Sequence, residues 1–243
     1  MDGIRINKYV SQCGYCSRRE ADRLLLQGKI YINGNVASMG DRVQAGDAVI
    51  IDGKAITPAE KEIIIAFHKP AGIVCTTSKK EKQNVIDYLH LEERVYPVGR
   101  LDKNSTGLLL LTNNGQLMDD ILRGSHYHEK EYIVTVDKAI PPAIYEAMEQ
   151  GVPILNTMTR PCRITHRCER RFHIILTQGL NRQIRRMCEY FGYRVRTLKR
   201  IRIMNIELGN LPEGKWRYLT ETEIRKLKQL AAGRTRERKD RHE

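Results

Sequence analysis

Apolar residues along the chain fall in short runs separated by polar turn residues, a pattern typical of alternating short strands and helices. Near the amino terminus, Ser17-Arg18-Arg19-Glu20 is a capping box that opens a helix, and Gly28 suits the left-handed residue that ends one. Apolar runs at 30–32 and 49–51 predict strands, and Asn33-Gly34 predicts a hairpin turn. We therefore expect a small domain of helices and a twisted sheet over residues 1–58.

From Ile63 onward the pattern predicts strands and helices in irregular order. Strands are expected at 63–67, 107–112, 132–136, 172–177 and 193–203, and helices at 116–122, 143–149, 182–191 and from Thr220 to about Leu230. Such an order favours an α+β fold with a mainly antiparallel mixed sheet flanked by helices. This second domain is expected over residues 62–232. The basic segment 233–243 is expected to be a disordered tail.

The stretch from Gly99 to Gly115, GRLDKNSTGLLLLTNNG, places an acid just before an apolar run. The four leucines 108–111 predict a strand buried on both faces, which anchors the preceding loop. Asp102 lies between Arg100 and Lys103, and nearby positive charge favours the ionised carboxylate. It is a candidate nucleophile or base, with Arg100 or Arg185 as its partner. The alternative is an aspartate that only bonds its own turn.

The net charge of the chain indicates which kind of partner it binds. The 243 residues include 42 Lys and Arg against 29 Asp and Glu, a formal net charge of +13. This excess favours a polyanionic partner, with nucleic acid first and an anionic membrane surface second. No run approaches the roughly 18 apolar residues that span a bilayer, and the first residues lack the hydrophobic region of a signal peptide. We expect a cytoplasmic protein without a membrane partner.

Residues 160–202 carry most of the excess, with 13 Lys and Arg against two acids. The helix expected at 182–191 has an apolar stripe opposite a polar face. Like charges on one helix face cost about 0.2–0.5 kcal/mol per pair, and cations at a helix start oppose its dipole. An anion bound at this start would relieve both effects. The cations in question are Arg182, Arg185 and Arg186.

Two further sets of cations are candidates for phosphate contact. In the strand at 193–203, four arginines alternate on one face and could follow a nucleic-acid backbone; the alternative is an edge strand protected by charge. In the amino-terminal domain, the alternative is an ordinary solvated helix face. The first set is Arg194, Arg196, Arg200 and Arg202, and the second is Lys8, Arg18, Arg19, Arg23 and Lys29.

The six cysteines are expected to be reduced, because nothing else in the sequence indicates an oxidising compartment. Cys13 and Cys16 could form half of a zinc site, with Cys162, His166 and Cys168 as the other half, although structural zinc usually uses tighter spacings. We expect neither a metal nor a cofactor.

Three motifs carry a family resemblance. The stretch GRLDKNSTGLLLLTNNG, KEYIVTV from Lys130 and GLNRQIRRM from Gly179 resemble the motifs of RsuA-type pseudouridine synthases. Residues 6–36, INKYVSQCGYCSRREADRLLLQGKIYINGNV, resemble the RNA-binding module named after ribosomal small-subunit protein S-four. The resemblance extends from about Ile4 to Leu230. The segments HEKEY, GVPIL and NRQIRRMCEYFGY resemble those of one branch of this family. Members of that branch modify large-subunit ribosomal RNA and can also act on a tyrosine tRNA.

The resemblance implies a function and the residues that perform it. Asp102 corresponds to the catalytic carboxylate, Tyr132 to the tyrosine that stacks on the target uracil, and Arg185 to the arginine that pairs with the aspartate. Arg100 corresponds to an arginine that can occupy the space of the extruded base. The expected partners are large-subunit ribosomal RNA and a tRNA, bound by a monomer.

The chemistry required is an isomerisation of uridine. The N1–C1′ bond breaks, the base turns, and C5 joins C1′ without a redox change. A carboxylate could stabilise the positive character at the sugar, attack the sugar, or remove a sugar proton, and the sequence leaves these routes open.

Two other functions fit parts of the sequence. A non-catalytic ribosome-assembly factor would use the same basic surfaces and would not need Asp102. A metal-dependent nuclease would need several carboxylates around Mg²⁺, whereas Asp102 has cationic neighbours.

Overall fold

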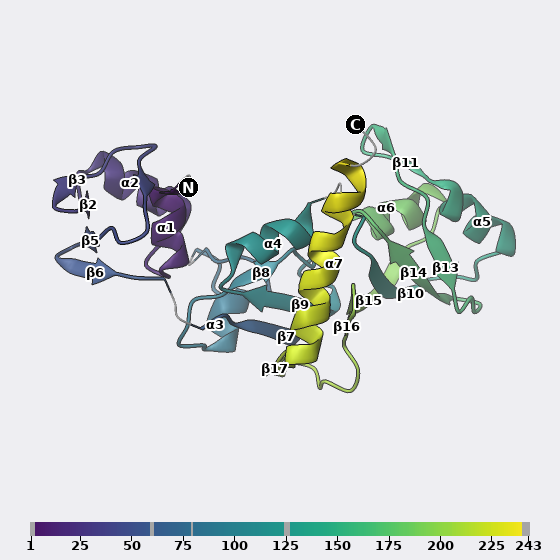
Figure 1. The fold of residues 1–243 in the computed structure, drawn as a ribbon. Helices are drawn as coiled ribbons and strands as arrows, with labels where there is room; N and C mark the ends of the chain where they lie inside the picture. Colours follow the sequence, from purple (N-terminus) through teal and green to yellow (C-terminus); the bar gives the residue numbers. More distant parts are fainter. Residues whose placement is uncertain (1–2, 59–60, 79, 124–126, 240–243) are drawn as a thin grey trace. The chain divides into compact units, whose positions relative to one another are not determined.

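The computed structural model describes residues 3–58, 61–78, 80–123 and 127–239 (Figure 1). The chain forms two compact units. The amino-terminal unit consists of residues 1–63 with the short segments 92–94 and 113–115, and the main unit contains the remaining residues. None of the helices in the described ranges combines the length and apolar character that crossing a membrane requires.

The amino-terminal unit has two helices and two small antiparallel sheets. Ser17 Oγ accepts a hydrogen bond from the Glu20 N–H at 3.2 Å, as the capping box predicts. Gly28 has φ +66°, and Asn33 and Gly34 have φ +49° and +83°, so the predicted helix end and hairpin turn are both present. The elements are β1 (Ile4–Arg5), α1 (Ile6–Gln12), α2 (Arg18–Leu26), β2 (Ile30–Ile32), β3 (Asn35–Val36), β4 (Arg42–Val43), β5 (Val49–Ile51) and β6 (Lys54–Ile56). The sheets are β1-β4 and β3-β2-β5-β6.

The main unit is built on a nine-stranded mixed sheet. Its strand order is β13-β14-β10-β15-β9-β7-β17, with β16 beside β15 and β8 beside β9. All these pairings are antiparallel except β15 with β9. The strands are β7 (Ile64–Lys69), β8 (Tyr96–Val98), β9 (Thr106–Thr112), β10 (Lys130–Val136), β13 (Arg163–Thr165), β14 (Arg171–Leu176), β15 (Val195–Ile203), β16 (Ile206–Glu207) and β17 (Trp216–Tyr218). The hairpin β11 (Pro153–Ile154) and β12 (Thr157–Met158) pairs separately.

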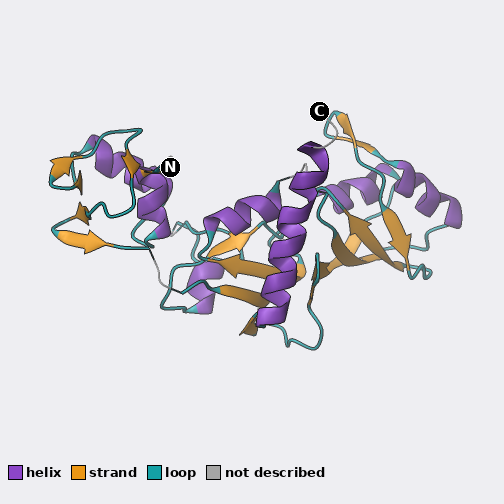
Figure 2. Ribbon diagram, in the orientation of Figure 1, coloured by secondary structure: helices purple, strands orange, loops and turns teal. Residues whose placement is uncertain are grey.

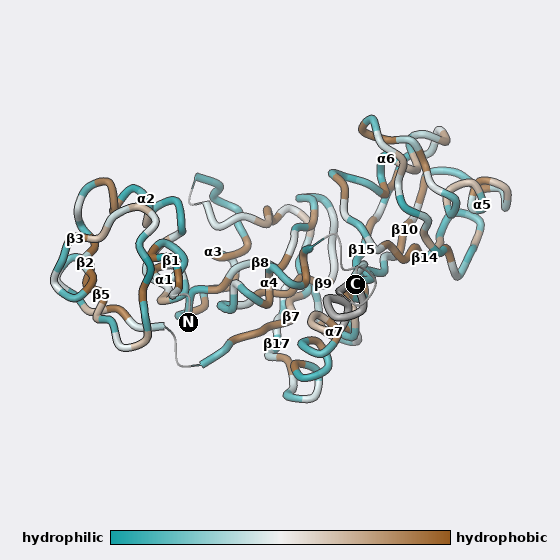
Figure 3. The backbone as a smooth tube through the Cα atoms, turned by 45° about the horizontal axis from the view of Figure 1, so that its top comes forward, coloured by the Kyte–Doolittle hydropathy of each residue, from teal (hydrophilic) through white to brown (hydrophobic). Residues whose placement is uncertain are grey.

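Helices cover the two halves of this sheet separately (Figure 2). The helices are α3 (Val85–Leu89), α4 (Gly115–Leu122), α5 (Pro142–Gln150), α6 (Gln183–Tyr190) and α7 (Glu221–Lys239). One core packs α5 and α6 against β10, β13 and β14. A second core packs α4 and α7 against β7 and β9. Strands β7 and β10 carry hydrophobic colours over much of their length (Figure 3).

The predicted α+β class with a mainly antiparallel sheet is confirmed. Residues Leu108–Leu111 are completely buried, as expected for a strand covered on both faces. The sequence did not predict α3, β8 or the hairpin β11–β12, which are short elements without a clear period. Helix α7 continues past Leu230 to Lys239, and so includes part of the segment expected to be a disordered tail; residues 240–243 lie outside the described residues.

Candidate active site

The loop between β8 and β9 presents Asp102 on a fixed backbone. On one side, Leu101 is buried and its N–H donates to Cys75 Sγ at 3.4 Å. On the other side, the N–H of the fully buried Ser105 donates to the Asp102 carbonyl at 3.0 Å. The Asp102 side chain remains 31% exposed. The loop is therefore anchored on both sides of a carboxylate that substrate can reach.

A buried lysine ties this loop to the end of β7. Lys69 is fully buried, and its Nζ donates to the carbonyls of Pro70, Ile73 and Lys103 at 2.7, 2.8 and 3.3 Å. Burial lowers the pKa of Lys69, while nearby acids, including Asp102, oppose this shift. Lys69 thus holds the backbone next to Asp102 and places a positive charge near the Asp102 carboxylate.

Two arginines from the region of α6 face the Asp102 carboxylate. Arg185 Nε lies 3.6 Å and Arg182 Nη1 lies 3.9 Å from Asp102 Oδ2. Arg185 also donates from Nη2 to Ser105 Oγ at 3.3 Å and from Nη1 to the Val195 carbonyl at 3.2 Å. Arg185 therefore connects the Asp102 loop to β15, and the predicted pairing of Asp102 with Arg185 is what the geometry shows.

The start of α6 has the predicted division of faces. Ile184, Met187 and Cys188 are buried, whereas Arg182 is exposed at the N-cap with φ +50°. A non-glycine residue at positive φ is uncommon and often occurs at functional sites. Here this backbone conformation places Arg182 at the edge of the Asp102 pocket.

Tyr132 shares a cavity with Asp102. The cavity has a volume of about 110 Å³ and is lined mainly by Arg100, Leu101, Asp102, Ser105, Tyr132, Leu176, Leu180, Arg182, Gln183 and Leu198. It adjoins a groove of about 1060 Å³, to which Arg100, Asp102 and Arg182 also belong. A carboxyl group, an aromatic ring and several guanidinium groups thus meet beside a space open to solvent.

The comparisons with known proteins identify the family. A model of the RNA pseudouridylate synthase family matches residues 63–190, and a model of the S4 domain matches residues 4–49. The chain belongs to the RNA pseudouridylate synthase family. It is therefore an RNA-modifying isomerase, and the predicted amino-terminal RNA-binding domain is confirmed.

Individual relatives agree with this assignment. The chain is 51% identical to the dual-specificity RNA pseudouridine synthase RluF of Salmonella typhi, covering 97% of this chain and 82% of the relative. It is 31% identical to the ribosomal large subunit pseudouridine synthase B of Bacillus subtilis, covering 93% of this chain and 96% of the relative. A crystal structure of a pseudouridylate synthase is similar with a TM-score of 0.68 at 27% identity, covering 93% of this chain and all of the other. The RsuA-type resemblance and its branch are confirmed.

Within this pseudouridylate synthase, the predicted RNA-binding cations occupy different settings. Arg100 and Arg182 line the groove beside Asp102. Arg186 is half-exposed, and its Nε donates to the Asn181 carbonyl at 3.1 Å. The other exposed cations among those predicted are Arg194 and Arg196 in the main unit and Arg18, Arg19 and Lys29 in the amino-terminal unit, where Lys8 is half-buried.

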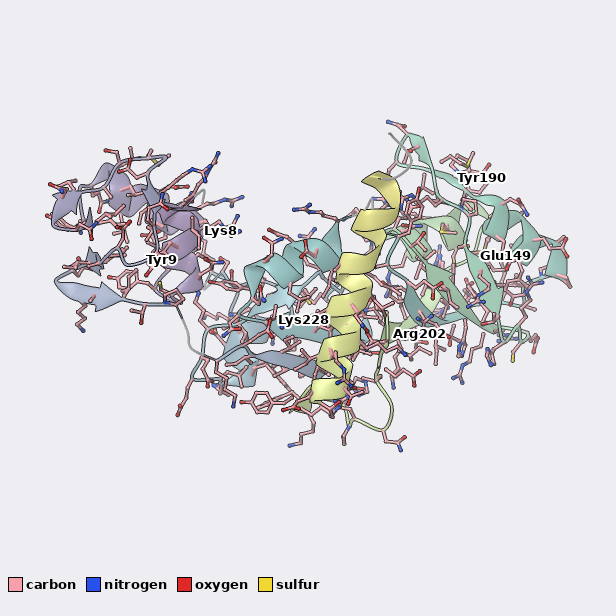
Figure 4. All side chains as sticks on the ribbon, viewed as in Figure 1. Lys8, Tyr9, Glu149, Tyr190, Arg202 and Lys228 are labelled. Carbon is pink, nitrogen blue, oxygen red and sulfur yellow. The ribbon has the colours of Figure 1, made fainter. Side chains whose placement is uncertain are left out.

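The interpretation of Arg194, Arg196, Arg200 and Arg202 as a basic strand face following nucleic acid is wrong for Arg200 and Arg202, and Arg194 precedes β15. Arg200 is only 2% exposed. Arg202, labelled in Figure 4, pairs with Glu129 at 3.1 Å and Glu131 at 3.0 Å. The edge-strand alternative is wrong too, because β15 lies between β10 and β9. Arginines at every second position do not distinguish a central strand from an edge strand, since that difference depends on pairing with strands far away in the sequence.

The cysteines do not form the suggested zinc site in the part of the chain that the structure describes. There, no group of three or more His, Cys, Asp or Glu side chains is arranged to hold a metal ion. Burial raises the pKa of Cys13 to about 11 and that of Cys162 to about 12. Both groups are therefore protonated thiols at neutral pH, which are poor metal ligands.

Proposed function

We propose that this chain converts a specific uridine of large-subunit ribosomal RNA into pseudouridine, with a tRNA as a second substrate. The substrate assignment is supported by the relatives, one named for dual specificity and another for the ribosomal large subunit. The observation that supports catalysis most directly is the Asp102 carboxylate, 3.6 Å from Arg185 and in one cavity with Tyr132.

Each of these residues has a role that follows from its position. Breaking the N1–C1′ bond develops positive character at the ribose, and the exposed Asp102 carboxylate can stabilise it, attack it or remove a sugar proton. Arg185 orients Asp102 because its other two nitrogens are fixed to Ser105 and β15. Tyr132 provides the aromatic surface on which the detached uracil stacks while it turns.

The base must leave its RNA stack before it can enter a cavity of this size. Extruding a base costs a few kcal/mol, which stacking on the enzyme and insertion of a side chain can offset. Arg100 is exposed on the rim shared by the cavity and the groove. It is therefore suited to fill the position that the base vacates.

RNA binding is proposed for the two sets of exposed cations, including those of the amino-terminal domain over residues 1–58. The proposed catalytic domain covers residues 62–232. We further propose that the protein acts as a monomer in the cytoplasm, since an extensive basic surface devoted to RNA is unfavourable for self-association.

The function is tested by mapping pseudouridine in total RNA from cells with and without the gene. We expect one or a few large-subunit positions, and a tRNA position, to lose the modification and to regain it when the wild-type gene is supplied. Supplying the Asp102→Asn variant should not restore it. Restoration by that variant, or rescue of ribosome assembly without modification, would favour the non-catalytic assembly factor.

A further inference from the structure

The two halves of the main sheet meet at a narrow joint. Strand β15 pairs with β10 through seven residue pairs, but with β9 through only two, Lys199 with Thr106 and Arg200 with Gly107. Asp102 precedes β9 on one side of this joint, whereas Tyr132 lies on β10 on the other side. A shift at the joint would therefore change the distance between Asp102 and Tyr132.

Arg200 occupies this joint with both its backbone and its side chain. A Cβ on Gly107 would lie 2.2 Å from the Arg200 carbonyl oxygen, so only glycine permits this close approach. Arg200 Nε donates to the Leu108 carbonyl of β9 at 2.7 Å. Towards the other half, Arg200 Cζ lies 5.9 Å from the ring centroid of Tyr132, which is also its cross-strand neighbour on β10.

Stability alone does not account for an arginine at this position. Its guanidinium is buried, and Nη2 has no hydrogen-bond partner among the described residues. A buried charge with an unsatisfied donor is unfavourable compared with a well-packed apolar side chain. The burial of Lys130, and then its repulsion by Arg200, lower the pKa of Lys130 to about 8, so the arginine also disturbs a neighbouring cation.

The contact with Tyr132 comes from outside the substrate cavity. Tyr132 lines the cavity that contains Asp102, whereas Arg200 does not. The guanidinium therefore contacts the ring without lining the cavity, which stays available to a base.

We propose that Arg200 is a positioning residue for uridine isomerisation, which holds the Tyr132 ring at a fixed distance from the strand that follows Asp102. It does so through a hydrogen bond to Leu108 on one side and a cation–π contact with Tyr132 on the other. This role rests on the proposed function of Asp102 and Tyr132.

The test compares Arg200→Met and Arg200→Lys with the control Arg202→Met, which removes a largely buried arginine from the same strand. The kcat and apparent KM are measured under multiple turnover on deproteinised large-subunit RNA from cells that lack the gene, with kcat normalised to the folded fraction. A small displacement of a catalytic group can cost about 100-fold, so we expect Arg200→Met to lower kcat by about that factor with KM changed less than about twofold. Arg200→Lys keeps the charge but not the planar fork, and should lower kcat by roughly threefold to tenfold.

The control separates positioning from simple support of the fold. Arg202→Met removes an ion-pair partner from Glu129 and Glu131, although Glu131 keeps its contact with His173 at 3.1 Å. It should therefore lower the melting temperature while kcat stays within about twofold of wild type. Equal kcat values for Arg200→Met and Arg202→Met would overturn the proposal. If Arg200→Met does not fold, Arg200→Lys decides, and a wild-type kcat for it overturns the proposal. Failure of the wild-type protein to form pseudouridine would instead refute the proposed function.

Discussion

Charged residues at this site either face the substrate or support the fold, and a buried charge that lacks hydrogen-bond partners lowers stability. Asp102 is exposed to substrate and meets positive charge from Arg182 and Arg185. Lys69 is buried, but its three carbonyl partners satisfy its ammonium group. Lys130 is less well satisfied, since its hydrogen bond among the described residues is a 3.4 Å contact from Nζ to the His128 carbonyl.

Lys130 should therefore reduce the stability of the protein at neutral pH. Burial lowers its pKa from 10.5 to about 8, so the folded state holds the proton less tightly than the unfolded state. The penalty is fully present below about pH 8 and disappears as the pH rises through 10.5. We expect Lys130→Met to raise the free energy of unfolding at pH 7 by about 1 kcal/mol.

Denaturant unfolding of the wild type and of Lys130→Met across pH 7 to 10.5 checks this expectation. The advantage of the variant should shrink as the pH rises. An advantage that grows with pH, or a variant less stable than wild type at pH 7, would contradict the assignment of Lys130 as a strained cation.

Among single residues, the sequence predicts the reacting groups better than the residues that hold them in position. Asp102 and Arg185 stand in recognisable motifs, and the structure brings them together. The supporting roles of Lys69, Ser105 and Arg200 depend on contacts with distant parts of the chain. Arg200, for example, bonds a carbonyl 92 positions away, and no local pattern encodes such a contact.

Among the elements, α7 shows how a local signal and a long-range contact combine. Its predicted capping box is complete: the Glu223 N–H donates to Thr220 Oγ1 at 3.2 Å, and the Thr220 N–H donates to Glu223 Oε2 at 2.8 Å. Arg217 of β17 adds two bonds to the same carboxylate, at 2.7 and 2.8 Å. The helix then packs Leu227 and Ala231 into the core.

Loss of this carboxylate should weaken the start of α7 in a pH-dependent way. The Arg217 hydrogen bonds, assisted by Thr220, lower the pKa of Glu223 from 4.5 to about 2. A depressed pKa means that the stabilisation is present above about pH 4.5 and is lost as the pH falls through about 2. We expect Glu223→Gln to cost about 1 kcal/mol at pH 7.

Chemical denaturation at pH 7 and again near pH 2.5 measures this effect. The difference between Glu223→Gln and wild type should become smaller at the lower pH. A difference of the same size at both values would show that the charge of Glu223 contributes nothing to the helix start.

Helices and strands with a clear period of apolar residues could be predicted from the sequence. Their arrangement in space could not. The buried leucine strand and the helices α4, α5 and α6 lie close to their expected ranges. The position of β15 in the middle of the sheet, with antiparallel and parallel neighbours, depends on pairings far apart in sequence. For this reason the local sequence pattern cannot show that Arg200 is buried and that Arg202 pairs with Glu129 and Glu131.

For the whole molecule, the net charge of +13 lies in the main unit, because the amino-terminal unit has ten Lys and Arg against ten Asp and Glu. Arg18, Arg19 and Lys29 are exposed in the amino-terminal unit, where the S4 family model matches. If each of them contacts a phosphate, replacing all three by alanine should reduce the slope of log K against log salt by about 2 for single-stranded RNA, since each contact contributes about 0.7.

A matched variant controls for net charge. Lys54, Lys215 and Lys226 are exposed cations outside the predicted contacts, and replacing these three by alanine removes the same charge. Filter binding of both triple variants across a salt series gives the two slopes. Equal slopes for them would show that the amino-terminal cations act only through net charge and not through specific phosphate contacts.

The most direct test of the central claim concerns one carboxylate. Purified Asp102→Asn keeps the shape of the side chain and removes its negative charge. Mixed with deproteinised large-subunit RNA in single turnover, it should bind the RNA within about threefold of wild type, yet form pseudouridine at least about 1,000-fold more slowly. Pseudouridine formation at the wild-type rate would contradict the assignment of Asp102 as the catalytic group.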